Sequence, residues 1–311
     1  MDRLPLSQNG KRQKIRIVCL ASTAYTVAIS AWFITWATIG DGNWWLAIIN
    51  RIAPFLFLPI PILAIPLAIS RHIKWGLPLF LPAVIFCVLY APYLFPRFAP
   101  ANSQPDLSIL SFNALYRNTN YDAVSDIVLA YRPDFVTFQE MQPEMMTELE
   151  QRLAGIYPYS IMGDEHPYGT TAIFSRHPGK EAYVLGLTTD RPAVVFRTEV
   201  SGKEVTVISA HLLAYGLQWV KLADMPKAIM ERTGAQNGQA KRILEEIQKQ
   251  EGVIILGCDC NSKETSSSSR ILAGQLSNAA RVAGWSLNVP NIPNAKQDTN
   301  LHHIDYIFYR G

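Results

Sequence analysis

The first hundred residues contain three long stretches without a charged side chain. These stretches cover residues 17–39, 52–70 and 75–96. A helix needs about 20 mainly apolar residues to cross the hydrocarbon core of a bilayer. The pattern therefore predicts three transmembrane helices, at about 17–39, 50–70 and 75–96, in a membrane module over residues 1–100. A soluble chain with three buried helices is the alternative, and three such stretches in close succession disfavour it.

Proline and aromatic positions refine this prediction. The second stretch carries four prolines, so we expect a kinked or broken helix there: Pro54, Pro59, Pro61 and Pro66. Rings that suit a membrane interface lie near the ends of the stretches, and these are Trp44, Trp45, Trp75 and Tyr93. The first stretch exceeds the apolar core of a cleaved signal peptide, about 7–15 residues, so we interpret it as an anchor.

The basic residues predict an orientation. Four of them precede the first stretch (Lys11, Arg12, Lys14 and Arg16), and Arg71 and Lys74 follow the second. The loop between the first two stretches carries only Asp41, although Arg51 and Arg97 reduce the contrast. Basic loops stay in the cytoplasm. We therefore expect a multi-pass protein of the cell membrane with a cytoplasmic N-terminus and an extracytoplasmic C-terminal domain.

After a polar linker over residues 101–105, short β-type runs alternate with helical stretches. Strands are predicted over residues 107–115, 135–140, 170–175, 182–187, 193–200, 204–212, 253–259 and 303–309. Helices are predicted over residues 121–131, 143–154 and 239–250, and over most of 266–283. Ser201 and Gly202 indicate a tight hairpin. This pattern predicts an α/β domain over residues 106–311, in which helices cover a sheet core.

Composition and charge separate the two parts further. The 311 residues are 49% hydrophobic and 17% charged, and 4 Cys exclude a disulfide-rich scaffold. Residues 1–100 hold 9 Lys and Arg against 2 Asp and Glu, whereas residues 101–311 hold 19 against 23. Binding to nucleic acid depends on basic surface. The acidic balance of the second part therefore disfavours long duplex DNA as its ligand.

Polar side chains recur where the apolar strands end. They are Asn113, Gln139, Glu140, His211, Asp259, Asn261 and Asp305. Each has an ordinary explanation when taken alone, such as a turn residue, a surface carboxylate or a partly buried histidine. Together they form an ordered series of the residue types that phosphoester chemistry uses.

This series resembles that of the endonuclease/exonuclease/phosphatase superfamily, which has the deoxyribonuclease-I-like fold. The matching pieces are SFNAL (111–115), DFVTFQE (134–140), TTAIFSR (170–176), ISAHL (208–212), LGCDCN (256–261) and HIDYIF (303–308). The resemblance extends over about residues 106–311 and does not include the apolar stretches. The resemblance implies a two-layer β-sandwich flanked by helices, with the site residues gathered at one end.

The resemblance also implies a divalent-metal-dependent phosphoesterase. Hydrolysis of a phosphodiester needs a cation, an activated water and donors to the phosphate oxygens. We expect Glu140 and Asn113 to supply oxygen ligands for Mg²⁺ or Mn²⁺. The resemblance implies that Asp259 positions or deprotonates water and that Asn261 binds the phosphate. His211 is expected to donate to a phosphate oxygen.

The end of the sequence departs from the family pattern. In the family a Ser-Asp-His stretch follows the last strand and supplies a catalytic histidine, whereas this sequence stops at Gly311. Asp305 resembles the residue that orients that histidine. We therefore expect a C-terminally incomplete domain with an open sheet edge and low activity. His302 and His303 are the candidate replacements, but they precede the strand that would have to position them.

Three further features have weaker functional interpretations. Cys258 and Cys260 flank Asp259 but lack the additional ligands of a zinc site, so we interpret them as small buried residues. Arg176 either binds phosphate or is structural. The turn at residues 168–171 either faces the substrate or is structural.

Two classes of function fit these observations. The first is a membrane-anchored phosphoesterase that acts on nucleic acid, a phospholipid head group or a small phosphodiester. The second is a catalytically inactive binding or scaffold protein that retains the fold. The expected partners are the lipid bilayer and a phosphoester substrate, and the sequence identifies no protein partner.

Overall fold

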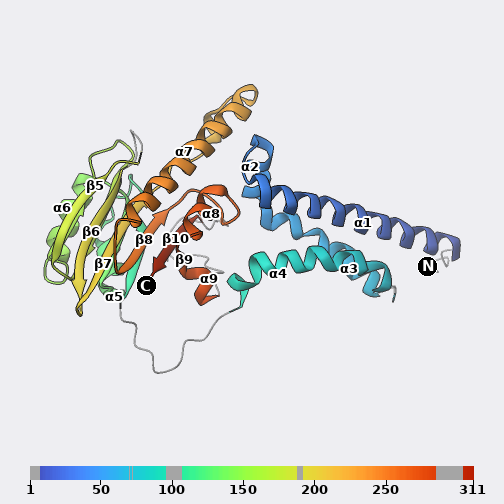
Figure 1. The fold of residues 1–311 in the computed structure, drawn as a ribbon, viewed down its shortest axis with the longest axis horizontal. Coiled ribbons are helices and arrows are strands. Elements are labelled where there is room, and N and C mark those ends of the chain that lie inside the picture. Colours follow the sequence, from blue (N-terminus) through green and yellow to red (C-terminus); the bar gives the residue numbers. More distant parts are fainter. Residues whose placement is uncertain (1–7, 70, 72, 96–106, 188–191, 285–303) are drawn as a thin grey trace.

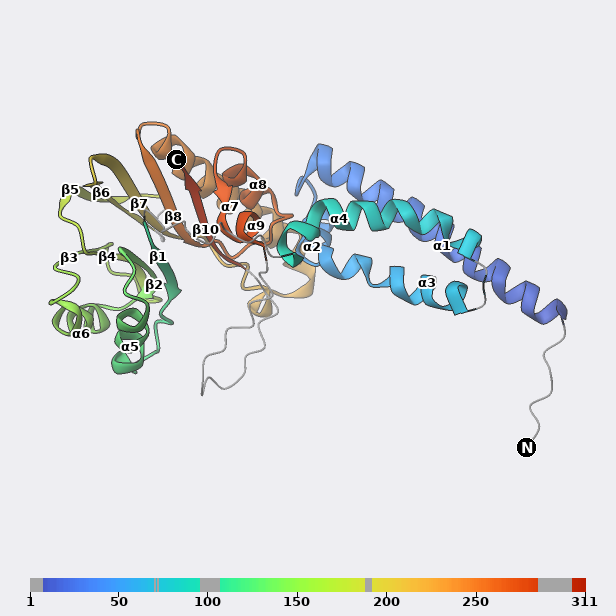
Figure 2. The ribbon, with the colours of Figure 1, turned by 90° about the horizontal axis from the view of Figure 1, so that it is seen from below.

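The structure of the protein is a computed structural model that describes residues 8–69, 71, 73–95, 107–187, 192–284 and 304–311. We refer to residues 8–95 as the helical module and to residues 107–311 as the sheet domain. Figures 1 and 2 show the helical module extending from one side of the layered sheet domain.

Apolar helices make up the helical module. They are α1 (Gln8–Ile39), α2 (Trp44–Arg51), the 3-10 helix η1 (Ala53–Phe57), α3 (Pro59–Ile69), the 3-10 helix η2 (Ile73–Leu79) and α4 (Phe80–Leu94). Residues Ile15–Ile39 and Gly76–Leu94 are long and apolar enough to cross a membrane. Trp44–Arg51 and Ala53–Ile69 pass the same test only together, and they are bent by 73°. The break expected in the second stretch is therefore confirmed, while the described residues offer two candidate spans, or three if the bent pair is one span.

Two sheets form the centre of the sheet domain. The first has the strand order β1-β2-β4-β3 and the second the order β5-β6-β7-β8-β10-β9. The first contains β1 (Ile109–Asn113), β2 (Phe135–Met141), β3 (Tyr159–Met162) and β4 (Thr170–Ser175). The second contains β5 (Gly179–Leu185), β6 (Ala193–Val200), β7 (Lys203–His211), β8 (Val253–Asp259), β9 (Ser277–Asn278) and β10 (Asp305–Arg310). β1 runs parallel to β2, and β7 runs parallel to β8.

Helices cover the outer faces of both sheets (Figure 1). α5 (Tyr121–Tyr131) and α6 (Pro143–Leu153) share an apolar cluster with the first sheet. α7 (Met225–Ile247) and α8 (Ser267–Ala273) share another with the second sheet, while α9 (Ala279–Ala283) follows β9. This is the expected two-layer β-sandwich flanked by helices. Short 3-10 helices, η3 (Leu217–Trp219) and η4 (Leu222–Asp224), lie between β7 and α7.

The alternation of side chains along β2 explains the layering. Val136 and Phe138 belong to the cluster with the helices, whereas Phe135 belongs to the cluster between the sheets. Gly257 of β8 allows a close approach of the sheets, because a Cβ there would lie 2.0 Å from the hydroxyl oxygen of Thr137. Period-two alternation thus supplies one face to each layer.

Most predicted elements coincide with observed ones, and the differences are local. The predicted helix at 239–250 begins much earlier, at Met225, and β3 was not predicted. The predicted helix over 266–283 is interrupted by β9. β9 also pairs with β10 through Asn278 and Ser277, so it covers part of the sheet edge that we expected to be open.

Hydrogen bonds join the end of α1 to α8. Arg270 donates to the main-chain oxygen of Trp36 at 2.6 Å, and the Ser267 N–H donates to the Asp41 carboxylate at 2.6 Å. Cations are favoured at the C-terminal end of a helix, where main-chain oxygens lack helical partners. The sheet domain therefore provides donors for the end of an apolar helix.

A second set of hydrogen bonds joins α4 to α9. Pro92 lies inside α4. Because proline has no N–H, the oxygen of Val88 has no donor four residues later in its own helix. Arg281 of α9 donates to this oxygen at 3.3 Å and to the oxygen of Leu89 at 3.2 Å.

Candidate active site

The ends of four strands bring the predicted residues to one edge of the sandwich. Asn113 ends β1, His211 ends β7, and Asp259 ends β8. Glu140 lies next to the last residue of β2. Parallel neighbours end at the same edge of a sheet, which brings Asn113 beside Glu140 in the first sheet and His211 beside Asp259 in the second. Packing of the two sheets then joins the pairs, so that Asn113 meets Asp259 although 146 residues separate them. Asp305 starts the antiparallel strand β10 directly opposite Asp259.

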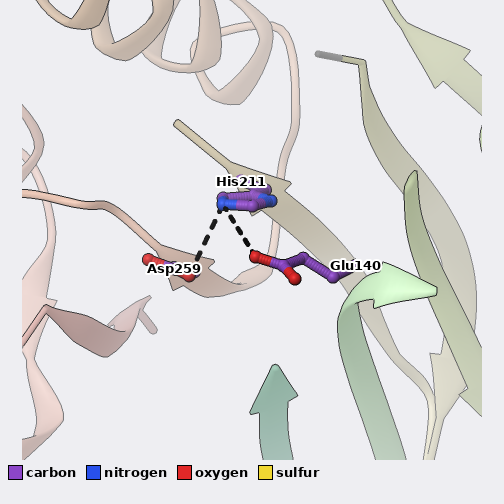
Figure 3. Close-up of side chains that lie close together, drawn as sticks. All are labelled: Glu140, His211 and Asp259. Carbon is purple, nitrogen blue, oxygen red and sulfur yellow. Dashed lines mark ion pairs between the residues drawn. The ribbon is translucent and has the colours of Figure 1, made fainter. Parts of the chain in front are cut away.

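The side chains of three of these residues converge in the structure (Figure 3). His211 Nε2 lies 3.5 Å from Asp259 Oδ2 and 4.0 Å from Glu140 Oε1. One ligand atom from each of Glu140, His211 and Asp259 lies within 4.8 Å of the other two. His211 and Asp259 are buried, and Glu140 is partly buried. The expected convergence is therefore observed.

Asn113 links the two carboxylates. Its side-chain amide donates to Asp259 Oδ2 at 2.7 Å and to Glu140 Oε1 at 3.3 Å. Its side-chain oxygen accepts from the Leu115 N–H at 2.9 Å. Because an N–H can only donate, this contact distinguishes the oxygen of the amide from its nitrogen. In the structure the Asn113 amide therefore donates to both carboxylates, and its oxygen is turned into the loop after β1. Its role as an oxygen ligand of a metal stays a prediction.

The main chain at Glu140 has an unusual conformation. Its φ is 55°, and the pairing of β2 with β4 shifts register between Phe138 and Met141. Gly169, with φ 73°, packs against it so closely that a Cβ there would lie 2.4 Å from the Glu140 carbonyl carbon. A bulge of this kind re-aims a side chain. This role of Gly169 is not evident from the sequence pattern, although residues 168–171 were a candidate turn facing the substrate.

The Glu140 carboxylate is also held from the loop after β1. The main-chain N–H of Tyr116 donates to Glu140 Oε2 at 3.2 Å. The Tyr116 ring packs edge-on against Tyr168 with their centroids 5.5 Å apart. Main-chain geometry and an aromatic contact therefore both fix this side of the site.

Three carboxylates, those of Glu140, Asp259 and Asp305, lie close together, and the pKa values of the two aspartates are raised. Burial, followed by the negative charge of Asp305, raises the pKa of Asp259 to about 7. Loss of hydration and the charge of Glu140 raise the pKa of Asp305 to about 6, although Asp305 as a residue is exposed. Like charges disfavour ionisation of their neighbours, and a bound cation removes that penalty.

The donor set fits a divalent cation. Glu140 and Asp259 offer carboxylate oxygens, which hard cations such as Mg²⁺ and Mn²⁺ prefer, and His211 offers an imidazole nitrogen, a common ligand of transition-metal ions. The accumulation of negative charge described above is what such an ion would neutralise. The residues at this edge therefore fit a metal-binding site.

Asn261 connects the ends of β7 and β8. Its side-chain amide donates to the main-chain oxygen of Leu212 at 2.9 Å, and its N–H donates to Asp259 Oδ1 at 3.1 Å. Its φ of 47° is in the left-handed region. The structure therefore places Asn261 beside the site with its amide bonded to the main chain.

Arg176 is not brought to this edge, which favours the structural one of its two interpretations over phosphate binding. It follows Ser175, which pairs with Phe135 at the start of β2, whereas Glu140 lies near the end of that strand. Its guanidinium donates to the main-chain oxygen of Arg132 at 3.3 Å. Antiparallel pairing thus places Arg176 at the opposite end of the sandwich. His302 and His303 lie outside the described residues.

Cys258 and Cys260 are buried, as expected, and they form a disulfide across Asp259. The sequence analysis treated them as separate small side chains. Alternation along a strand places residues two apart on the same face, so the pairing is compatible with the β8 conformation.

Comparison with known proteins places the sheet domain in a family. Residues 110–311 match the model of the endonuclease/exonuclease/phosphatase family. The chain belongs to this family, and its paired sheets with flanking helices have the deoxyribonuclease-I-like fold. No curated protein matches the chain.

Solved structures with similar folds share little sequence with this chain. TDP2 of D. rerio, complexed with a single-strand DNA product, is 19% identical over 66% of this chain and 84% of that chain, with a TM-score of 0.49. A β-hairpin deletion mutant of beta toxin from Staphylococcus aureus is 19% identical over 66% and 87%, with a TM-score of 0.46. A family protein from Bacteroides thetaiotaomicron is 17% identical over 65% and 82%, with a TM-score of 0.49.

Proposed function

We propose that the protein is a membrane-anchored, divalent-metal-dependent phosphoesterase that hydrolyses a phosphodiester. The observation that carries this proposal is the convergence of Glu140, His211 and Asp259 at one edge of the sandwich. Membership of a family whose members are commonly metal-dependent hydrolases supports it.

Each residue has a role in this proposal. A divalent ion held by Glu140, with Asp259 and His211 beside it, would neutralise charge that develops on the phosphoryl oxygens. Asn113 keeps the two carboxylates in place through its amide. Asp259 positions the attacking water and accepts its proton. His211 and Asn261 supply donors for the phosphate oxygens. Asp305 adds negative charge next to Asp259.

Anchoring in the cell membrane is the second part of the proposal. The apolar helices Ile15–Ile39 and Gly76–Leu94 have the length of spans, and the bent pair between them is the candidate third. The basic residues before α1 and after α3 favour a cytoplasmic N-terminus. The disulfide between Cys258 and Cys260 supports an extracytoplasmic sheet domain, since disulfides persist in oxidising compartments.

The substrate class follows from charge. The excess of acidic residues in the second part of the chain favours a small phosphodiester or a phospholipid head group over a long nucleic acid.

The test uses the purified full chain in detergent with Mg²⁺ or Mn²⁺. Bis(p-nitrophenyl) phosphate, phospholipid in mixed micelles and single-stranded DNA are offered separately. We expect metal-dependent hydrolysis of at least one, which chelation removes. Failure on all three substrates with either metal would contradict the proposal and favour a binding or scaffold protein.

A further inference from the structure

The segment between β7 and α7 carries the most exposed large apolar side chains of the sheet domain among the described residues. Trp219 is 86% exposed and Leu222 is 81% exposed. Lone exposed apolar residues are ordinary, whereas exposed apolar residues that gather in one segment are the candidates for a contact surface. The segment begins at Leu212, directly after His211.

Hydrogen bonds to α7 fix the first residues of this segment, while Trp219 and Leu222, which we call its apolar tip, stay exposed to solvent. The Leu213 N–H donates to Gln239 Oε1 at 2.9 Å, and the Leu213 oxygen accepts from Gln236 at 2.6 Å. Tyr215 is buried, and its hydroxyl hydrogen-bonds to Thr233 at 2.5 Å. All three partners belong to α7.

The segment is also packed against the helical module. Tyr215 and Ile229 form a buried cluster with Ala47 of α2, and Arg51 lies 4.0 Å over the Tyr215 ring. Figures 1 and 2 both show the start of α7 beside α2, at the end of the helical module that meets the sheet domain. Leu217 and Met225, on either side of the apolar tip, pack on the same cluster as Ala47 of α2. The tip therefore lies near the ends of the apolar helices, where the surface of a bilayer would be.

The chemistry at this level favours lipid over a protein partner. Trp44 and Trp45, at the start of α2, are 42% and 44% exposed. Tryptophan prefers the boundary between acyl chains and head groups, and leucine and valine prefer the acyl side. Lys221, between the two exposed apolar residues, is itself exposed and suits the phosphates of that boundary.

We propose that Trp219 and Leu222 insert into the outer surface of the bilayer and that the candidate active site therefore opens toward lipid head groups. The contact with the bilayer is a second attachment in addition to the apolar helices. The substrate class, a phosphodiester carried by a membrane lipid, rests on the proposed function.

The contact is tested without any activity. Leu222→Cys is made in the full chain with Cys19→Ala and Cys87→Ala, spin-labelled and reconstituted in phosphatidylcholine vesicles. Cys258 and Cys260 are buried and bonded, so they do not react. We expect the label to collide more often with dissolved oxygen than with a water-soluble nickel chelate. Tyr131→Cys is the control, because Tyr131 is 75% exposed at the end of α5, away from the helical module (Figure 1). Equal behaviour of the two labels would overturn the proposal.

The substrate class is tested by comparing two substrates. The double variant Trp219→Ser/Leu222→Ser is assayed on phosphatidylglycerol in vesicles and on soluble bis(p-nitrophenyl) phosphate, with Tyr131→Ser as the matched control. We expect at least about a tenfold loss on vesicles, because a lipid head group must arrive in a productive orientation, and no loss on the soluble substrate. Equal losses on both substrates, or none, would overturn the substrate class. If the unaltered protein hydrolyses neither, the lipid substrate class fails, the test with three substrates described above decides the proposed function, and the spin-label comparison still decides the contact.

Discussion

Arg51 of α2 donates a hydrogen bond from Nη1 to the main-chain oxygen of Asn261 at 3.1 Å. The donor belongs to the helical module, and the acceptor lies two residues after Asp259. Gln236 of α7 donates to the same oxygen at 3.2 Å. The apolar part of the chain therefore helps to fix the loop that follows a candidate catalytic residue.

Replacing Arg51 by Gln should lower turnover on the order of tenfold to a hundredfold, because small displacements of reacting groups have effects of that size. The Asn261 N–H donates to Asp259, so movement of Asn261 moves the carboxylate. Turnover and melting temperature of the full chain provide the measurement. Arg71→Gln, at an exposed arginine of the same module, is the control. Unchanged turnover in Arg51→Gln would show that Gln236 is sufficient.

Glu140→Gln should leave the protein folded and abolish its response to Mg²⁺ or Mn²⁺. The substitution removes a negative charge with little change in shape, and charge dominates affinity for a hard cation. Titration calorimetry and turnover at limiting metal measure the effect. Glu144→Gln, at an exposed position in the first turn of α6, should behave like the unaltered protein. Equal metal affinity in both variants would remove Glu140 from the site.

Metal-free protein should become less stable as the pH rises from about 4 to about 7. The raised pKa values of Asp259, about 7, and Asp305, about 6, mean that the folded protein binds more protons than the unfolded chain in this window. Stability falls with pH where the folded state binds more protons.

Mg²⁺ should therefore raise the melting temperature more at about pH 7.5 than at about pH 5.5, where protons compete for the same carboxylates. Thermal melts with and without chelator measure this difference. Asp259→Asn should remove most of the pH effect. A Mg²⁺ effect of equal size at both pH values would refute the assignment.

Gly169→Ala should disturb the site more than an alanine at another glycine with positive φ. At Gly169 the new Cβ meets the Glu140 main chain, whereas at Gly202, with φ 77°, it meets open space. Both substitutions carry backbone strain of about 1–2 kcal/mol, so their difference isolates the clash. We expect Gly169→Ala alone to lose metal binding, measured by calorimetry. Equal metal affinity in the two variants would mean that Glu140 still binds the metal when its main chain is displaced.

The orientation across the membrane has a direct test. A reporter fused after Arg310 should be active outside the cytoplasm, and intact mass measurement should find two free thiols, Cys19 and Cys87, with Cys258 and Cys260 oxidised. A cytoplasmic reporter would reverse the predicted orientation.

Patterns of period two and long apolar runs were sufficient to predict most of the fold. The limits of α5, β4, β6 and β8 follow from residues that alternate or repeat locally. Proximity of Asn113 to Glu140 and of His211 to Asp259 also follows, because parallel neighbours end at one edge of a sheet. What no local pattern carries is the φ of Glu140, the approach of Gly169 to it and the direction of the Asn113 amide. These depend on contacts between segments distant in the sequence. The two interpretations of Arg176 stayed open for the same reason, since the antiparallel direction of β4 that puts it at the other end is a long-range feature.

The proline in α4 has a consequence for how the two parts of the chain are held together. Arg281 donates to the main-chain oxygen of Val88, which lacks a donor in its own helix because Pro92 has no N–H. An irregularity in α4 thus provides an acceptor for a side chain of the sheet domain. The donor and the acceptor lie almost two hundred residues apart in the sequence. The substitution Pro92→Ala would supply the missing N–H to the Val88 oxygen, so that Arg281 would compete with a helical donor although it is itself unchanged. One of the contacts that orient the sheet domain on the helical module therefore depends on a proline within α4.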